Sequence, residues 1–174
     1  DLLSEIPFAQ DGTITYESFM NKYNTDLANT LGNLVNRTVA MTNKYFGGSV
    51  KAPNGIADAD KELIETAGET VRLYTARMDA YRSADATDAV MTLARRCNKY
   101  IDETTPWSLA KDEEQKPRLE AVLYNLLECI RIISVLLKPI MPSSAASVSE
   151  QLGTDCEATS FGTVKEYTVG EGKP

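Results

Sequence analysis

Three side chains in this sequence have the types and spacing needed to recognise a flat, hydrogen-bonding ligand. Asn33 and Arg37 are four residues apart in a segment of helical periodicity. They are therefore offset by about 40° and separated by about 6 Å along the helix axis. An amide and a planar guanidinium fork suit the Watson–Crick edge of an unpaired nucleobase. The alternative is a surface asparagine beside an ion-paired arginine, and spacing alone favours it.

Trp107 is the only tryptophan and directly follows Pro106. An indole held in a turn stacks on a splayed base, an interaction of about 1–3 kcal/mol. The alternative is an indole packed into the end of a bundle with its N–H bonded to a carbonyl, and the residue type alone favours that alternative. We expect Asn98 and Pro106 to support this turn, with the Asn98 side chain bonded to backbone near the Pro-Trp step.

Composition removes most catalytic chemistry. The chain has no histidine and only three widely spaced cysteines, Cys97, Cys129 and Cys156. This excludes the Ser-His-Asp triad and the Cys-His pair, and it argues against the common zinc sites and a disulfide framework. Glycine-rich phosphate loops are also missing. We therefore predict no catalytic residue, no metal site and no cofactor within this chain, and the free cysteines fit a cytoplasmic protein.

The net charge of −7 argues against a nucleic-acid binder, because phosphate contacts usually require a basic surface. It still allows a domain that reads a few bases while other domains hold the backbone. Four scattered lysines are candidates for phosphate contacts, although such lysines are also ordinary surface residues: Lys44, Lys51, Lys99 and Lys111.

Apolar residues recur every three or four positions in five segments. The pattern predicts an all-α fold, an antiparallel bundle of four long helices plus one short helix, at about 16–45, 58–81, 86–104, 117–137 and 143–152. Asp58 or Asp60 is expected to cap the second helix, whose apolar stripe extends to Tyr81. Three regions are expected: a linker over residues 1–14, the bundle over 15–153, and an irregular C-terminal tail over 154–174.

The most apolar segment, residues 119–140, is interrupted by charged residues that include Glu128 and Arg131. We therefore expect a central core helix rather than a membrane span. The chain begins with Asp1, and no signal peptide is visible. This start is expected for a fragment of a longer protein.

Three sequence segments resemble methionyl-tRNA synthetases, in the same order as in that family. Residues 5–12 (EIPFAQDG) and 23–38 (YNTDLANTLGNLVNRT) are similar to the entry into the family's helical bundle and to its first helix. Residues 98–111 (NKYIDETTPWSLAK) are similar to its second hallmark, and residues 138–142 (KPIMP) to the close of its long buried helix. The resemblance covers roughly residues 1–153.

This resemblance implies the anticodon-binding domain of a ligase that attaches methionine to tRNA(Met). It implies that Asn33 and Arg37 contact the first anticodon base, a cytosine, and that Trp107 stacks on it. It further implies that ATP, Mg and methionine bind to a catalytic domain that precedes this chain, so the fragment alone should be inactive. Partners would be the CAU anticodon loop and that catalytic domain, with no membrane.

Two alternatives stay open at this stage. Related bundles occur in the class I synthetases for leucine, isoleucine, valine and cysteine, and an exchange of anticodon tests that reading. The acidic charge also allows a helical protein-interaction module with no nucleic-acid role, which would form a stable oligomer or protein complex and leave no tRNA footprint.

Overall fold

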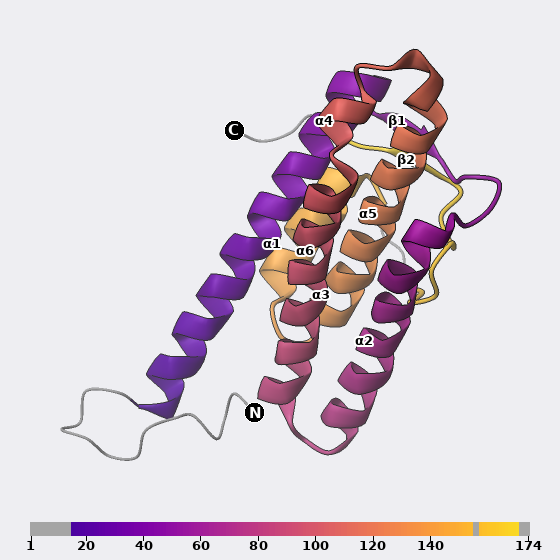
Figure 1. Ribbon diagram of the computed structural model, residues 1–174. Helices are drawn as coiled ribbons and strands as arrows, with labels where there is room; N and C mark the ends of the chain where they lie inside the picture. Colours follow the sequence, from indigo (N-terminus) through magenta and orange to yellow (C-terminus); the bar gives the residue numbers. More distant parts are fainter. Residues whose placement is uncertain (1–14, 155–156, 171–174) are drawn as a thin grey trace.

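The apolar periodicity of the sequence appears as a bundle of helices in the computed structural model, which describes residues 15–154 and 157–170 (Figure 1). The prediction of four long helices and one short helix is confirmed. The long helices and the short one are α1 (Tyr16–Phe46), α2 (Lys61–Asp79), α3 (Ser83–Thr104), α5 (Lys116–Leu137) and α6 (Pro142–Leu152).

Short elements connect these helices. The single turn α4 (Pro106–Leu109) and the 3-10 turn η3 (Glu113–Gln115) join α3 to α5, and the 3-10 turn η2 (Asp58–Asp60) precedes α2. Strand β1 (Ser49–Lys51) pairs antiparallel with β2 (Glu166–Thr168). Over residues 157–170 the tail is irregular, as predicted, apart from β2.

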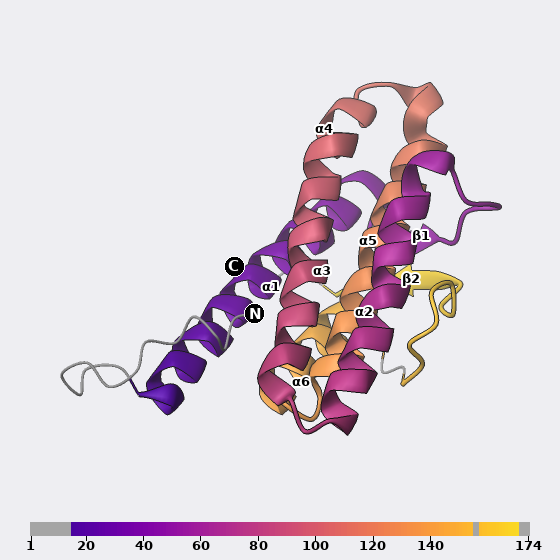
Figure 2. The same cartoon turned by 60° about the horizontal axis from the view of Figure 1, so that its bottom comes forward.

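Consecutive long helices run in opposite directions. Helices α1, α3 and α6 point one way and α2 and α5 the other (Figures 1 and 2). The α3–α4–α5 corner and the C-terminal end of α1 therefore lie at one end of the bundle. The α2–α3 and α5–α6 turns lie at the other end, together with the start of α1.

Helix α5 is the centre of the core, as its composition predicts. It packs against α1, α2, α3 and α6, and it is buried on nearly every side. Each such apolar side chain contributes about 1.5–3 kcal/mol by leaving water. The fully buried α5 residues include Leu123, Leu126, Ile130, Ile133 and Leu137.

The helix boundaries follow local chemistry. Thr15 Oγ1 accepts a hydrogen bond from the Ser18 N–H at 3.0 Å and caps α1. Gly47 ends α1 with φ 61°, and Gly153 ends α6 with φ 69°, left-handed conformations that glycine adopts freely. Asp60, one of the two predicted capping residues, occupies the N-cap position of α2, but its side chain makes no capping bond there.

The α2 stripe also ends earlier than predicted. Tyr81 lies beyond the helix in a left-handed conformation (φ 58°), with 96% of its surface exposed. Cys97 and Cys129 are free and buried, whereas Cys156 lies outside the described residues. Within residues 15–154 and 157–170, none of the helices combines the length and the apolar character that a membrane crossing needs.

Candidate nucleic-acid interface

Helix α1 presents Asn33 and Arg37 to solvent along the edge of its buried face. Both side chains are exposed, while Leu34 and Thr38 beside them are buried. The Thr38 hydroxyl is satisfied by the Leu34 carbonyl at 2.8 Å, so the polar atoms under this edge do not compete for a ligand. The two candidate readers thus lie on a rigid helix face that a ligand can reach.

The guanidinium of Arg37 is oriented by α3. Its Nη1 donates to Asn98 Oδ1 at 3.3 Å, and Asn98 Nδ2 donates to the Ala94 carbonyl at 3.4 Å. The expectation that Asn98 bonds to backbone near Pro106 is therefore wrong. Across residues 15–154 and 157–170, no carboxylate forms a salt bridge with Arg37, so the ion-paired alternative is not what the structure contains.

Trp107 projects from the single turn α4 at the α3–α5 corner. Helix α3 ends because Thr105 adopts a left-handed conformation (φ 43°) ahead of Pro106. Pro106 is buried, and the Thr105 carbonyl accepts from Ser108 N at 2.9 Å. The indole remains 43% exposed. It is therefore reachable from solvent, which argues against an indole packed inside the bundle end.

Other contacts bring α4 to the end of α1. Tyr45 lines one small hollow together with Leu109 and Lys116. Lys116 Nζ also lies 5.6 Å from the centre of the Phe46 ring. Along α3, the rise from Asn98 to Thr104 is only about 9 Å. The contacts thus locate the Arg37–Asn98 pair and the α4 corner toward the same end of the bundle.

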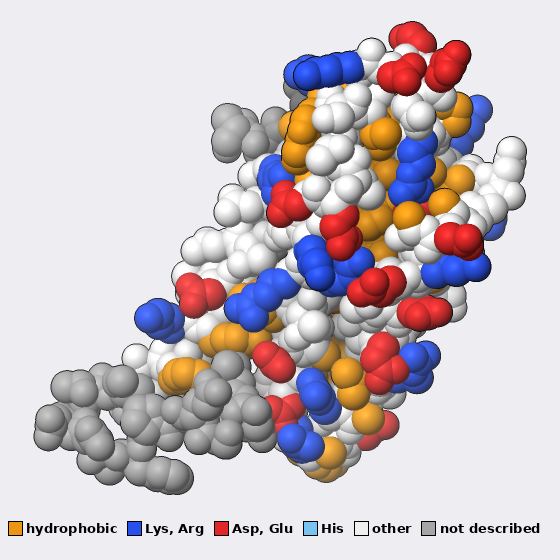
Figure 3. Space-filling model, in the orientation of Figure 1, with side chains coloured by type: hydrophobic (Ala, Val, Ile, Leu, Met, Phe, Trp, Pro, Cys, Tyr) orange, Lys and Arg blue, Asp and Glu red, His pale blue; other side chains and the backbone are white. Residues whose placement is uncertain are grey.

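Charge on this end is mixed rather than uniformly basic. Figure 3 shows lysine and arginine side chains interspersed with carboxylates over the face that it displays. The four lysines that we singled out are all exposed, and Lys44 Nζ lies 5.5 Å from the centre of the Tyr45 ring. A surface of this kind offers isolated phosphate contacts, not a continuous basic groove.

Asp60 is a buried carboxylate that bonds to residues of α3 and α5 at the α4 end of the bundle. It is 2% exposed and accepts bonds from Arg118 Nη1 (2.7 Å) and Nη2 (2.9 Å), from the Tyr100 hydroxyl (2.7 Å) and from Asn125 Nδ2 (2.9 Å). Burial raises the pKa of Asp60, but the Arg118, Tyr100 and Asn125 bonds outweigh burial and lower the pKa below its usual value.

Sequence reasoning missed Asp60 as part of the site, because an aspartate just ahead of a helix has the pattern of an ordinary N-cap. The donors to its carboxylate lie 40, 58 and 65 residues away in the sequence, so no local sequence pattern predicts them.

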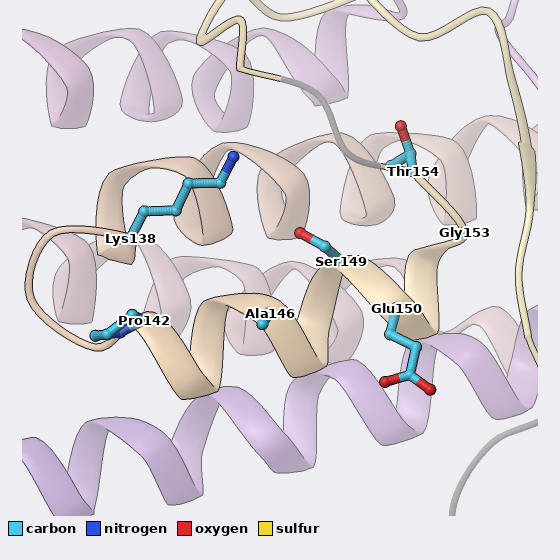
Figure 4. A pocket seen from close by; sticks show the side chains of 7 residues that line it. All are labelled: Lys138, Pro142, Ala146, Ser149, Glu150, Gly153 and Thr154. Carbon is cyan, nitrogen blue, oxygen red and sulfur yellow. The ribbon is translucent and has the colours of Figure 1, made fainter.

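One other feature lies at the opposite end of the bundle. A shallow hollow lined by Lys138, Ser149, Glu150 and Thr154 lies beside α6 and the end of α5 (Figure 4). Helix α5 has 22 residues, so about 33 Å of helix separates that end from the α4 corner. In the part of the chain that the structure describes, no cluster of metal-ligating side chains occurs.

Comparison with known proteins gives first a class and then a family. Residues 2–39 match a family profile described as "tRNA synthetases class I (M)". Residues 50–168 match the profile described as "Anticodon binding domain of methionyl tRNA ligase". The second match covers more than half of the chain, and the chain belongs to this family of anticodon-binding domains.

Relatives agree with this assignment. The chain is 49% identical over 166 residues to a methionine–tRNA ligase of Clostridium perfringens, covering 95% of this chain and 25% of that protein. The ligase of Bacillus subtilis is 43% identical over 181 residues, covering 99% of this chain and 27% of that protein. The chain thus spans about a quarter of the relatives' length.

A solved structure shares the fold. The Mycobacterium tuberculosis methionyl-tRNA synthetase in complex with methionyl-adenylate superposes with a TM-score of 0.79 at 34% identity. The match covers 98% of this chain and 35% of that one. The helical bundle described above is thus similar to the corresponding part of that synthetase.

Proposed function

We propose that this chain reads the CAU anticodon of tRNA(Met) within a methionine–tRNA ligase. Arg37 and Asn33 contact the first anticodon base, and Trp107 stacks on it. The catalytic domain of the same polypeptide, which lies outside this chain, attaches methionine with ATP and Mg, and the enzyme acts in the cytoplasm. The observation that carries the proposal is the exposed indole at the same bundle end as an arginine that pairs with no carboxylate among the described residues.

The chemistry of these groups favours cytosine over uracil. Arginine has donors and no acceptor, so its fork fits the O2 and N3 acceptors on the Watson–Crick edge of cytosine. Uracil presents an N3–H donor at the same place, and that donor would face the guanidinium unpaired. Because the mismatch leaves polar groups desolvated, it costs about 1–3 kcal/mol. The Asn33 amide oxygen can accept from the cytosine amino group.

The indole supplies affinity and the polar pair supplies selectivity. Base–aromatic stacking is tolerant of sequence and contributes about 1–3 kcal/mol. The mixed charge on the face shown in Figure 3 and the net charge of −7 favour few phosphate contacts. We therefore expect weak binding by the isolated chain, with a modest salt dependence.

The test is a titration of labelled RNA stem-loops, read by fluorescence anisotropy, with CAU and with UAU in the loop. The wild-type chain should prefer CAU. Both Arg37→Ala and Trp107→Ala should weaken CAU binding about tenfold or more, as expected for the loss of about 1.4 kcal/mol or more. The Arg37→Ala variant should also lose the preference.

The matched control is Arg72→Ala. Arg72 is an exposed arginine on α2 that pairs with Glu69 at 2.5 Å, away from the proposed site. Equal binding of CAU and scrambled loops by the wild-type chain would show that these residues do not read the anticodon.

A further inference from the structure

The carboxylate of Asp60 joins both flanks of the corner that carries Trp107. Its Tyr100 donor lies four residues before Thr104, where α3 ends. Its Arg118 donors belong to the first turn of α5, at 2.7 and 2.9 Å. The segment between these two contacts contains the whole of α4. A single buried group thus fixes where that segment leaves one helix and where it enters the next.

Helix α4 also rests against this network. Leu109, at the end of α4, lines the same hollow as Tyr100, Thr104 and Arg118. The packing of α4 against α5 completes the contact. A shift of Arg118 or Tyr100 would therefore displace the side chains that lie next to α4, the turn that presents the indole.

A buried carboxylate contributes little to the free energy of unfolding by itself. Removing a charge from water costs several kcal/mol, and apolar residues of similar volume often serve equally well in a core. A carboxylate with bidentate arginine, phenol and amide donors instead imposes direction on every partner. Asp60 accepts all of these bonds. The donors lie on α3 and α5, the two helices that α4 connects.

We propose that Asp60 is a positioning residue for anticodon reading, because it holds the α3–α4–α5 corner in the geometry that presents Trp107. This inference rests on the proposed function for its consequence in binding. Its structural part, the dependence of the indole's setting on Asp60, can be measured without RNA.

The experiment uses the single tryptophan as the reporter, because all indole fluorescence of this chain comes from Trp107. The variant Asp60→Asn keeps the side-chain volume and removes the charge. It should change the emission maximum and the acrylamide quenching of Trp107. It should also weaken CAU stem-loop binding about five- to tenfold, while the helical circular dichroism stays at the wild-type level.

The matched control is Glu128→Gln, which alters another buried carboxylate of the core. Glu128 is 0% exposed and pairs with Arg131 at 2.8 Å on α5, where it binds the C-terminal segment. This variant should lower stability without changing Trp107 fluorescence or CAU affinity at a temperature where both variants are folded. Tyr100→Phe removes one donor and should give a smaller change of the same kind, about two- to threefold in affinity.

If Asp60→Asn does not fold, Tyr100→Phe still tests whether the bonds to Asp60 set the environment of Trp107. The inference is overturned if Trp107 fluorescence is unchanged in the folded variants. It is equally overturned if Asp60→Asn and Glu128→Gln lose affinity in proportion to the stability they lose. A wild-type chain that does not discriminate CAU would refute the proposed function, while the fluorescence data would still decide the role of Asp60.

Discussion

The guanidinium of Arg37 is held from one side by a neutral partner. Its bond to Asn98 is 3.3 Å long and joins α1 to α3. An amide oxygen orients the fork without neutralising it, whereas a carboxylate would compete with a ligand for the same donors. The pairing is therefore suited to an arginine that must stay available to a base.

Asn98 should accordingly matter for binding more than for folding. We expect Asn98→Ala to weaken CAU stem-loop binding about 2–10-fold, the equivalent of one hydrogen bond of about 0.5–1.5 kcal/mol. The free energy of unfolding should change by less than about 0.5 kcal/mol, since the bond lies at the surface. The double variant with Arg37→Ala should lose no more than Arg37→Ala alone, and additive losses would show that Asn98 acts independently.

The reading role that we propose for Asn33, Arg37 and Trp107 follows from the sequence only through resemblance. The spacing of Asn33 and Arg37 predicts that they share one helix edge, as the structure shows. Without the resemblance, however, spacing and residue type favour an ordinary structural role for these two residues and for Trp107. Arg37 and Asn98 are 61 residues apart, so their contact depends on the packing of α1 against α3. Asp60 was misread for the same reason, because its partners come from distant elements.

Among the elements, the α2–α3 turn carries a strain that can be relieved. Tyr81 has φ 58° and is 96% exposed, so its side chain gains little from packing. The left-handed region costs a non-glycine residue roughly 1–2 kcal/mol. Glycine adopts it freely but loses about 0.5–1 kcal/mol of chain entropy.

We therefore expect Tyr81→Gly to raise the free energy of unfolding by about 0.5–1 kcal/mol. Tyr81→Ala keeps the Cβ and the strain, and it should leave stability close to that of the wild type. Urea unfolding followed by circular dichroism compares the three chains. Indistinguishable midpoints for the glycine and alanine variants would mean that this turn stores no strain.

Helices were predictable because their signal is local and repeats over many residues. The α1 stripe and its Gly47 stop follow from the sequence alone. Boundaries that depend on tertiary contact did not follow. Ser83 begins α3 although Ser83-Ala84-Asp85 has the composition of a polar break, and Asp85, 5% exposed, is buried by its neighbours.

For the molecule as a whole, the C-terminal segment is bonded to the core through the charged side chains of Glu128 and Arg131. In the sequence, these two residues only interrupt an apolar segment. Glu128 Oε1 accepts from the Tyr167 hydroxyl at 2.5 Å, and Glu128 Oε2 accepts from the Gly162 N–H at 2.6 Å. Arg131 donates to the Ser160 carbonyl at 2.9 Å. These bonds join the tail to the central helix, which no periodicity argument could have predicted.

The buried tyrosines should decide how the whole chain responds to alkali. Burial raises the pKa of each of them above the usual value of 10, that of Tyr124 to about 12. They lie on α1, α2, α3, α5 and β2, and are Tyr23, Tyr74, Tyr100, Tyr124 and Tyr167. Above pH 10 the unfolded chain therefore releases protons that the folded chain retains.

Because the unfolded state then binds fewer protons, the free energy of unfolding falls as pH rises. The tyrosine contribution should be fully present below about pH 10. Above it, five tyrosines together give a slope of at most about 7 kcal/mol per pH unit, enough to exhaust a stability of about 5–15 kcal/mol within one or two units. In one alkaline titration, the loss of helical circular dichroism should coincide with the rise in tyrosinate absorbance that these five of the eight tyrosines contribute.

Tyr167→Phe provides the control for this prediction. It removes one titrating phenol, and the slope above pH 10 should become shallower by about 1.4 kcal/mol per pH unit. Loss of the bond to Glu128 lowers the starting stability at neutral pH, so the slope and not the midpoint is the quantity to compare. If tyrosinate absorbance instead rises fully near pH 10 while the helical signal is intact, the phenols are open to solvent and do not couple alkali to unfolding.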